Sequence, residues 1–290
     1  MKRYTAGLLR RLDKAGMLNR FNFSLTYKTK NKKFIIPVIN SVGYQLYGGS
    51  EKWATDLYEK LININPGTFV DVGANLGQTL LKIASINKEI PYVGFEPNPL
   101  CFFYLKKIID TNKLKNCNIF PVGLSYENKI VTLLLNNDIA SGASILEGFR
   151  ENKNKYNLRQ NIPVMKGDKI FETINETIGV LKADVEGAEL EVVKGLRQTI
   201  LKHKPFVVLE ILPVYSLEKE NGRYRQERQN ELLKQLKELD YQMFRIDEST
   251  GALHALTDIE VHGDMNKTNY VFSPVQKMES IKKNFTVIAQ

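Results

Sequence analysis

The chain has 290 residues, of which 43% are hydrophobic and 25% are charged. This length and composition exclude a chain that is disordered throughout and allow a sizeable buried core. The two cysteines, Cys101 and Cys117, have no C-x-x-C partner, and no stretch approaches the roughly 20 apolar residues of a membrane span. We therefore expect a cytoplasmic protein with reduced cysteines.

The formal charge of +9 comes from the N-terminal segment. Residues 1–33 contain ten Lys or Arg residues and a single acid, Asp13, so the other 257 residues are neutral overall. A neutral domain has no general attraction for a polyanion, and we expect no nucleic-acid partner. Any attraction to an anionic surface should come from residues 1–33.

Residues 4–18 carry apolar side chains at helical spacing, opposite three basic residues, and predict a short basic amphipathic helix. We expect this helix to dock on its own domain or on a second copy of the chain in a homodimer. Peripheral contact with a membrane or another partner is the alternative. A solvated charge run or hairpin at 28–33 and a strand at 34–38 should follow.

The first half of the main domain alternates strands and helices. A helix over 51–62 leads into a buried strand at 68–72. The pattern then predicts helices over 77–87 and 99–112 and strands over 92–96 and 118–122. This βαβαβ order predicts a parallel sheet, as in the first half of a doubly wound fold.

The second half resumes this alternation after an irregular stretch. Residues 130–135 predict a strand, 136–144 a loop, and 149–161 a solvated helix or loop, with a mobile cover over the site as the alternative. The later elements are strands at 178–184, 206–211, 241–246 and 270–272 and helices at 188–201 and 227–239. The second half of the domain therefore repeats the alternation of strands and helices seen in the first half.

The turn after the strand at 68–72 favours a nucleoside ligand. A dinucleotide fingerprint needs G-x-G-x-x-G, whose middle glycine lies against a pyrophosphate, whereas the turn at 73–77 is Gly-Ala-Asn-Leu-Gly. Glu96 ends the next strand, 25 positions after Asp71, where nucleoside-binding folds place the acid that takes both ribose hydroxyls. The spacing therefore favours a nucleoside without a diphosphate.

Four motifs occur in order along the chain. They are Asp-Val-Gly-Ala-Asn-x-Gly at 71–77, Phe-Glu-Pro-Asn-Pro at 95–99, Lys-Ala-Asp-Val-Glu-Gly-Ala-Glu at 182–189 and Pro-Phe-Val-Val-Leu-Glu at 205–210. Together, over roughly residues 51–273, they resemble the FkbM family of S-adenosylmethionine-dependent methyltransferases. The resemblance implies a Rossmann-like class I methyltransferase fold. Such an α/β fold has a mostly parallel seven-stranded sheet, helices on both faces and an antiparallel last hairpin.

The resemblance also implies a cofactor and an activity. The cofactor would be S-adenosyl-L-methionine, and the reaction O-methylation of a hydroxyl on a sugar, a glycan or a related small metabolite. The methyltransferase domain would cover 51–275, after a basic helix and extension at 1–50 and before a C-terminal tail at 276–290. A nucleotide-dependent oxidoreductase and a catalytically silent binding protein of the same fold are the alternatives.

The glycine turn is expected to hold the methionine end of this cofactor. Backbone groups of Gly73, Asn75 and Gly77 should approach it closely, and Asp71 should accept a hydrogen bond from its ammonium, directly or through water.

The nucleoside end is assigned to the next strand ends. Glu96 should hold the ribose diol, because a carboxylate at the end of a buried strand is seldom there for packing. Asn98 and the turn at Gly123 and Leu124 are the candidates for adenine contacts.

Lys182, Asp184 and Glu186 form the candidate catalytic group. The two-residue period of a strand places them on one side, at the edge where open α/β sheets bind ligands. Asp184 or Glu186 should be the general base for the acceptor hydroxyl, while Lys182 keeps that base ionised or orients the acceptor. The structural alternative is that Glu186, with Glu189, supports a helix N-terminus and that Lys182 makes an ordinary ion pair.

Other polar residues are weaker candidates. Glu210 also ends a strand and is a candidate second acid or ligand carboxylate. His254 and His262 are the fallback general bases. The His and Asp residues lack the spacing of a metal site, so no metal is expected.

Overall fold

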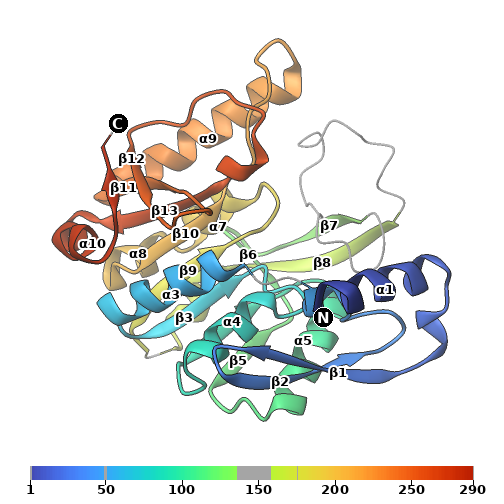
Figure 1. Cartoon of the computed structure of the whole chain (residues 1–290). Helices are drawn as coiled ribbons and strands as arrows, with labels where there is room; N and C mark the ends of the chain where they lie inside the picture. The colour runs from blue at the N-terminus through green and yellow to red at the C-terminus, as the bar shows by residue number, and fades with distance from the viewer. Residues whose placement is uncertain (1, 49–50, 136–157, 175, 290) are drawn as a thin grey trace.

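The computed structural model describes residues 2–48, 51–135, 158–174 and 176–289. A nine-stranded sheet with the strand order β14-β12-β11-β13-β10-β9-β3-β4-β5 crosses the molecule (Figure 1). Helices cover both faces of this sheet. The doubly wound α/β fold expected from the sequence is confirmed.

One half of the sheet is parallel and buried. Its neighbouring strands are β5 (Cys117–Phe120), β4 (Tyr92–Phe95), β3 (Thr68–Val72), β9 (Ile178–Ala183) and β10 (Phe206–Glu210). Every residue of β3, β4 and β9 is buried, which explains why their sequences are almost continuously apolar. The carboxyl ends of these parallel strands lie at the same edge of the sheet.

Two hydrophobic clusters cover the two faces. The helices α3 (Lys52–Ile64), α4 (Gln78–Ile86) and α5 (Pro99–Asn112) share one cluster with Phe69 and Val208. The helices α6 (Gly167–Phe171), α7 (Glu189–Gly195), α8 (Arg197–His203) and α9 (Glu220–Glu238) share the other with Val70 and Val207. Adjacent residues of a strand thus point into different clusters, as the pleat requires.

The helix expected over 188–201 is interrupted. It is divided at Leu196 into α7 and α8. Gly195 packs so closely on the next layer that a Cβ atom there would lie 2.0 Å from the carbonyl oxygen of Ser125. The close approach explains why glycine stands at this position.

The other half of the sheet is antiparallel where it meets the parallel strands. The strand β13 (Asn269–Pro274) lies between β10 and β11 (Tyr241–Ile246) and is antiparallel to both, as expected of the last hairpin. Two short strands, β12 (Leu253–Leu256) and β14 (Val287–Ile288), then extend the edge. The expected count of seven strands is therefore wrong, because strands of four and two residues are too short to show a period.

The C-terminal segment packs on the main sheet. A short 3-10 turn, η3 (Met265–Lys267), precedes β13, and η4 (Val275–Lys277) and α10 (Met278–Asn284) follow it. Ile281 of α10 is fully buried in the cluster that contains Phe69. The residues expected to form a tail thus contribute to the core.

The N-terminal extension also reaches the core. It consists of α1 (Lys2–Lys14), η1 (Leu18–Arg20), the hairpin β1 (Phe23–Thr29) and β2 (Lys32–Val38), and α2 (Gln45–Gly48). The predicted helix and hairpin are confirmed. Phe34 and Ile36 of β2 are fully buried in the same cluster as Phe69.

A small sheet forms a separate layer near the carboxyl edge. It has the order β6 (Gly123–Ser125), β8 (Leu158–Lys166) and β7 (Lys129–Leu135), and β7 confirms the strand expected at 130–135. The prediction of a helix or loop at 149–161 is wrong for 158–161, which begin β8. Residues 149–157 and the predicted loop at 136–144 lie outside the described residues. The strand β8 is mostly exposed, with only Ile162 and Val164 buried, so its buried apolar signal is short.

Candidate functional site

The glycine turn after β3 lies against both neighbouring strands. Gly73 has a φ of +81°, and a Cβ atom there would lie 2.1 Å from the carbonyl oxygen of Asp184. The N–H groups of Gly73 and Ala74 both donate to the Phe95 carbonyl at 3.0 Å. Glycine is needed at position 73 for the positive φ and because the backbone after β9 passes so close.

The rest of the turn contacts the end of β4. Asn75 has a φ of 48°, and its N–H donates to Oε2 of Glu96 at 2.7 Å. Gly77, with a φ of +94°, begins α4 and packs near Leu105. The expected contact of Gly77 with a cofactor stays a prediction, since Gly77 lines neither of the two cavities described below.

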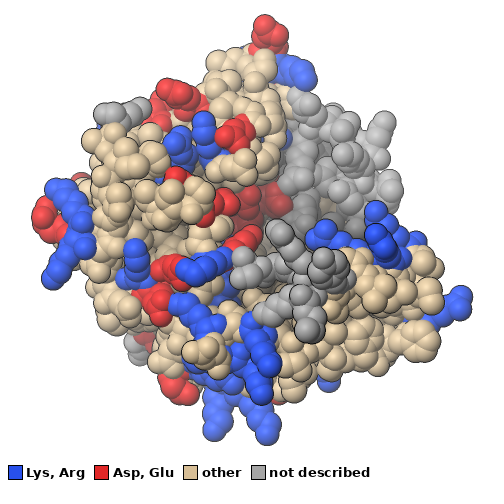
Figure 2. Space-filling view, in the orientation of Figure 1, with Lys and Arg blue, Asp and Glu red and all other residues tan. Residues whose placement is uncertain are grey.

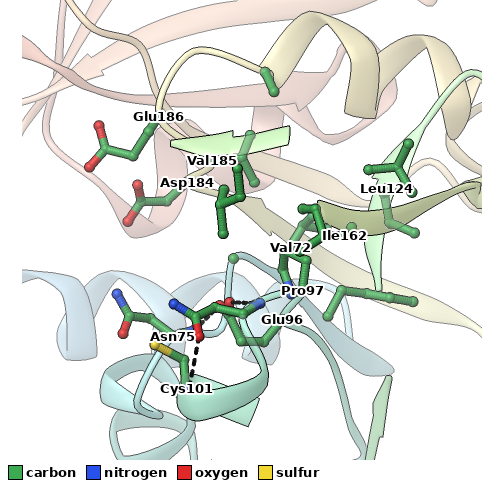
Figure 3. A pocket seen from close by; sticks show the side chains of 17 residues that line it. Val72, Asn75, Glu96, Pro97, Cys101, Leu124, Ile162, Asp184, Val185 and Glu186 are labelled. Atoms are coloured by element: carbon green, nitrogen blue, oxygen red, sulfur yellow. Dashed lines mark hydrogen bonds between the residues drawn. The ribbon is translucent and has the colours of Figure 1, made fainter. Parts of the chain in front are cut away.

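Glu96 is a buried acid with lone pairs to spare. Its side chain is held by two backbone donors, Asn75 N–H on Oε2 and Asn98 N–H on Oε1, the latter at 2.8 Å (Figure 3). Burial raises the pKa of Glu96 to about 7, and the two backbone hydrogen bonds limit the rise. Each carboxylate oxygen has about two acceptor positions, so one remains on each for a ligand diol.

Asn98 begins α5. Its side-chain oxygen accepts from the N–H groups of Leu100 at 3.0 Å and Cys101 at 3.5 Å, which is the N-cap arrangement. The amide therefore fixes the helix start that follows Glu96. Its expected contact with adenine stays a prediction.

The first cavity opens at the carboxyl ends of β3 and β4. Six of the eight predicted cofactor residues line it: Gly73, Asn75, Glu96, Asn98, Gly123 and Leu124. Asp184 and Glu186 of the predicted catalytic group line it as well. Figure 3 shows these two carboxylates pointing to one side of the opening, away from Leu124 and Ile162.

The small sheet supplies a wall that the sequence did not reveal. Leu133 of β7 and Ile162 and Val164 of β8 line the first cavity and form a buried cluster of their own. The local signals for this wall are the strand predicted at 130–135, which contains Leu133, and the alternation of Ile162 and Val164 with exposed neighbours.

Asp71 and Lys182 form a buried ion pair below the cavities. They are opposite each other on β3 and β9, with Lys182 Nζ 3.2 Å from Asp71 Oδ1. The Tyr92 hydroxyl donates to Asp71 Oδ2 at 2.6 Å. Asp71 is fully buried and lines neither cavity, so its expected contact with the ammonium of a cofactor stays a prediction.

Lys182 links this buried pair to the surface. Its Nζ lies 3.4 Å from Oδ2 of Asp184 and 3.5 Å from the Gly73 carbonyl oxygen. Burial lowers the pKa of Lys182, but Asp71 and Asp184 raise it by more, so the pKa lies above its usual value. The side chain therefore carries a fixed positive charge.

A second cavity of about 400 Å³ lies beside the first, and we call it the acidic cavity. It shares the wall made by Gly73, Asn75, Asp184 and Glu186. Beyond that wall its charged lining residues are Glu51, Lys82, Lys182, Glu210 and Glu248. Figure 2 shows acidic side chains near the centre of this face of the molecule.

Asp184 and Glu210 form a carboxyl pair in the acidic cavity. They follow Ala183 and Leu209, which are paired in register on β9 and β10, so the two side chains leave neighbouring strand ends. Burial raises the pKa of Glu210 to about 8, and the charge of Asp184 and a hydrogen bond with it add to the rise. The hydrogen bond between the two carboxyl groups fits a Glu210 that holds its proton.

Glu186 and Glu189 have separate positions. Glu189 is buried, accepts from the N–H groups of Val185 and Gly187 at 3.2 Å, and fixes the start of α7. Burial raises its pKa to about 7. Glu186 instead has a φ of 55° and lines both cavities. The helix-start role considered for Glu186 thus belongs to Glu189.

The fallback bases lie elsewhere. His254 is on β12, and Nδ1 of His262 accepts from the N–H of Asp264 at 3.2 Å. Neither lines the two cavities. Across the described ranges, no three or more His, Cys, Asp or Glu side chains are grouped so that they could hold a metal ion.

The first cavity fits a nucleoside. Apolar side chains of the small sheet face a buried carboxylate that keeps free lone pairs, so a flat base and a sugar diol both find matching groups. Gly73 has no side chain, so its backbone can lie directly against the backbone of Asp184.

A family model described as "Methyltransferase FkbM domain" matches residues 71–243. "Methyltransferase 1" of Beauveria bassiana (strain ARSEF 2860) is 24% identical over 143 residues, which is 44% of this chain and 57% of that protein. The chain thus spans about half the length of the curated relative that it matches.

Solved structures of methyltransferases resemble the chain at low identity. The FkbM methyltransferase of Methylobacillus flagellatus KT is 20% identical with a TM-score of 0.43, covering 71% of this chain and 43% of that chain. The fibrillarin of Aeropyrum pernix, solved with natively bound S-adenosyl-L-methionine, is 12% identical with a TM-score of 0.39, covering 86% of this chain and 82% of that chain.

Proposed function

Because this chain belongs to the FkbM methyltransferase family, we propose that it methylates a hydroxyl group of a sugar or glycan. Its fold is that of a class I methyltransferase, and its cofactor is S-adenosyl-L-methionine. When bound, this cofactor supplies an electrophilic methyl group. The protein has to hold the acceptor oxygen in line with that group and take up the proton of the hydroxyl.

The first cavity is the proposed cofactor site. Glu96 would hold the ribose hydroxyls, while Leu124, Ile162 and Val164 would cover the adenine. The shared wall with Asp184 would face the methionine end. These roles are consistent with the chemistry of each side chain, since a carboxylate accepts hydrogen bonds and an apolar wall packs on a flat ring.

The acidic cavity is the proposed acceptor site. A sugar presents several O–H donors on a small frame, and carboxylates are the acceptors that suit them. Asp184, Glu186 and Glu210 supply such acceptors, and Trp53 adds an aromatic face to the lining. The composition of this cavity supports a polyhydroxylated acceptor.

The carboxyl pair is the proposed proton acceptor. Asp184 lies at the shared wall, with Oδ2 3.4 Å from Nζ of Lys182. Glu210, whose pKa is raised, would supply the proton of the hydrogen bond between the two carboxyl groups. The proton of the acceptor hydroxyl would move to the pair, and Glu186 would help to orient the acceptor.

The shared wall is the observation that carries the proposal. Asp184 and Glu186 line both cavities at once, so a carboxylate can contact an acceptor at the point where it meets the cofactor. Two separate cavities would give no such meeting point.

The test is a search for a methylated product. The protein is incubated with S-adenosyl-L-methionine carrying a deuterated methyl group and with a mixed pool of monosaccharides, nucleotide sugars and oligosaccharides. Mass spectrometry should find the label on a hydroxyl oxygen of a sugar in the pool. Label on nitrogen or carbon, or only on molecules that are not sugars, would contradict the proposal.

Binding calorimetry tests the two alternatives. S-adenosyl-L-methionine should bind and NAD should not. This result would argue against an oxidoreductase. A protein that binds the cofactor but transfers no label to any pool would be a silent binding protein. The variant Asp184→Asn is the matched control, since it should bind cofactor and transfer little label.

A further inference from the structure

The helix α1 is held to the molecule by one face only. Leu9 is buried, and Oδ2 of Asp13 accepts from the Tyr44 hydroxyl at 2.9 Å, next to α2. Gly7, Leu8 and Arg11 are exposed. The helix is therefore fixed in place with its opposite face turned to solvent.

Apolar side chains stand out from this region. Leu8 is 57% exposed, and Phe21, just after η1, is 63% exposed, more than any other described aromatic side chain. Leu8 and Arg11 are three residues apart and share a side of the helix. Exposed apolar side chains next to basic ones are typical of surfaces that contact an interface.

The basic side chains of this region have no ion-pair partner among the residues that the structure describes. Arg10, Arg11, Lys14 and Arg20 are exposed, and none of them takes part in an ion pair with another described residue. The hairpin differs, because Lys30 is paired with Glu59. Figure 2 shows Lys and Arg side chains over α1.

We propose that Leu8, Arg10, Arg11, Lys14, Arg20 and Phe21 form a surface that docks on an anionic lipid bilayer. We call it the N-terminal surface. Its charge complements acidic headgroups, and Leu8 and Phe21 can enter the boundary between headgroups and acyl chains. The contact is peripheral: of the helices in the described ranges, none is long and apolar enough to cross a bilayer.

Charge favours a bilayer over a second copy of the chain as the occupant. The N-terminal surface contains four basic residues and no acid, so two such surfaces brought face to face would repel each other. An anionic bilayer attracts the same charge, by about fivefold in affinity for each basic residue near it. Residues 34–290 are neutral overall and add no general attraction to an anionic bilayer.

Vesicle co-sedimentation of the full chain tests the proposal. The protein should pellet with phosphatidylcholine vesicles containing about 30% phosphatidylglycerol and not with phosphatidylcholine alone. Raising the salt from about 0.1 M to about 0.5 M should release it. The variant Arg10→Gln/Arg11→Gln should bind about 10- to 30-fold more weakly.

Matched variants show whether the N-terminal surface itself binds the bilayer. Lys234→Gln/Lys237→Gln removes the same charge from exposed positions of α9 and should bind vesicles like the parent. Leu8→Ser/Phe21→Ser keeps the charge and should bind several-fold more weakly. Equal binding by the Arg10/Arg11 variant and the parent overturns the proposal. So does binding to poly(U) RNA that exceeds binding to the vesicles, which would assign the surface to nucleic acid.

Discussion

The first cavity and the acidic cavity share a wall but differ in what lines the rest. Away from that wall, the first cavity is mostly apolar, and its one acid, Glu96, is held by two backbone donors. The acidic cavity adds three further acids and only two lysines: Glu51, Glu210, Glu248, Lys82 and Lys182. The first cavity thus holds a single acid with hydrogen-bond donors, whereas the acidic cavity holds several carboxyl groups of like charge close together.

This difference indicates which side does chemistry. Both lysines of the acidic cavity already have carboxylate partners, Lys82 with Glu51 at 2.7 Å and Lys182 with Asp71 and Asp184. Burial and the neighbouring charge of Asp184 raise the pKa of Glu210, and holding carboxyl groups close together in this way costs stability. Such arrangements concentrate at functional sites. Under the proposed function, the first cavity would bind the cofactor and the acidic cavity would take up the proton.

The largest expected effect comes from disrupting the close packing of Gly73 against Asp184 in the shared wall. Gly73→Val would force a branched side chain into the Asp184 carbonyl and into a φ of +81°. We expect a loss of about 3 kcal/mol or more in the free energy of unfolding and no measurable binding of S-adenosyl-L-methionine. Urea denaturation and calorimetry measure the two quantities.

Gly251→Val separates strain from contact. Gly251 has a φ of +74° but no atom within 4 Å of its Cβ position. This variant should lose only about 1 to 2 kcal/mol and keep its cofactor affinity. If Gly73→Val behaves like Gly251→Val, the close packing at the shared wall is not what the site needs.

The next effect distinguishes the two cavities by function. Asp184→Asn should bind S-adenosyl-L-methionine within about threefold of the parent but turn over about 10²- to 10⁴-fold more slowly on the sugar identified by mass spectrometry. Glu248→Gln changes another acid of the acidic cavity, one that accepts from Asn269 at 2.8 Å, and should stay within a few-fold. If Glu248→Gln turns over slowly and Asp184→Asn turns over like the parent, the proton acceptor lies on the Glu248 side of the acidic cavity and not at the shared wall.

The sequence predicted the first cavity better than the acidic one. The glycine turn and Glu96 each follow a buried strand, so local pattern places them at one sheet edge. The sequence identified both Asp184 and Glu210 as candidates but did not predict their contact, because the pairing of β9 with β10 sets it. Residues such as Glu51 and Glu248 come from distant parts of the chain and give no local signal.

Register also explains what was missed around Asp71. The sequence marks it as an acid at a strand end, yet its partners Tyr92 and Lys182 come from the strands on either side. The wall from β7 and β8 was missed for a similar reason, since Leu133 and Ile162 meet only through pairing across a long connection. Contacts between strands depend on strand pairing and register, and local patterns in a single sequence do not determine these.

A smaller effect tests the first cavity. Glu96→Ala should weaken S-adenosyl-L-methionine binding by about 1.5 to 3 kcal/mol, the scale of lost hydrogen bonds to a charged group. Asp168→Ala is the matched control, because Asp168 is a buried acid with hydrogen bonds to Thr199 and lies outside both cavities. It should lower stability and leave affinity unchanged. Equal affinity in the parent and the Glu96 variant would remove Glu96 from the cofactor site.

The last prediction tests the carboxyl pair through pH. The pKa of Glu210 is raised to about 8 in the folded protein, against about 4.5 for an unfolded chain, so folding takes up a proton between these values. The stability from this proton is fully present below about pH 4.5 and is lost as the pH rises through about 8. Charged groups near Glu210 are Asp184, Glu186 and Lys182.

Glu210→Gln removes this titration and leaves that of Glu96 and Glu189 in place. Relative to the parent, the variant should therefore gain in the free energy of unfolding as the pH rises from about 5 to about 8. Asp184→Asn should remove part of the same pH dependence, because it takes away the neighbouring charge that raises the pKa of Glu210. Urea denaturation at several pH values measures both. If the difference between the parent and the Glu210 variant is constant with pH, the two carboxyl groups share no proton, and Asp184 would have to act as a base without its neighbour.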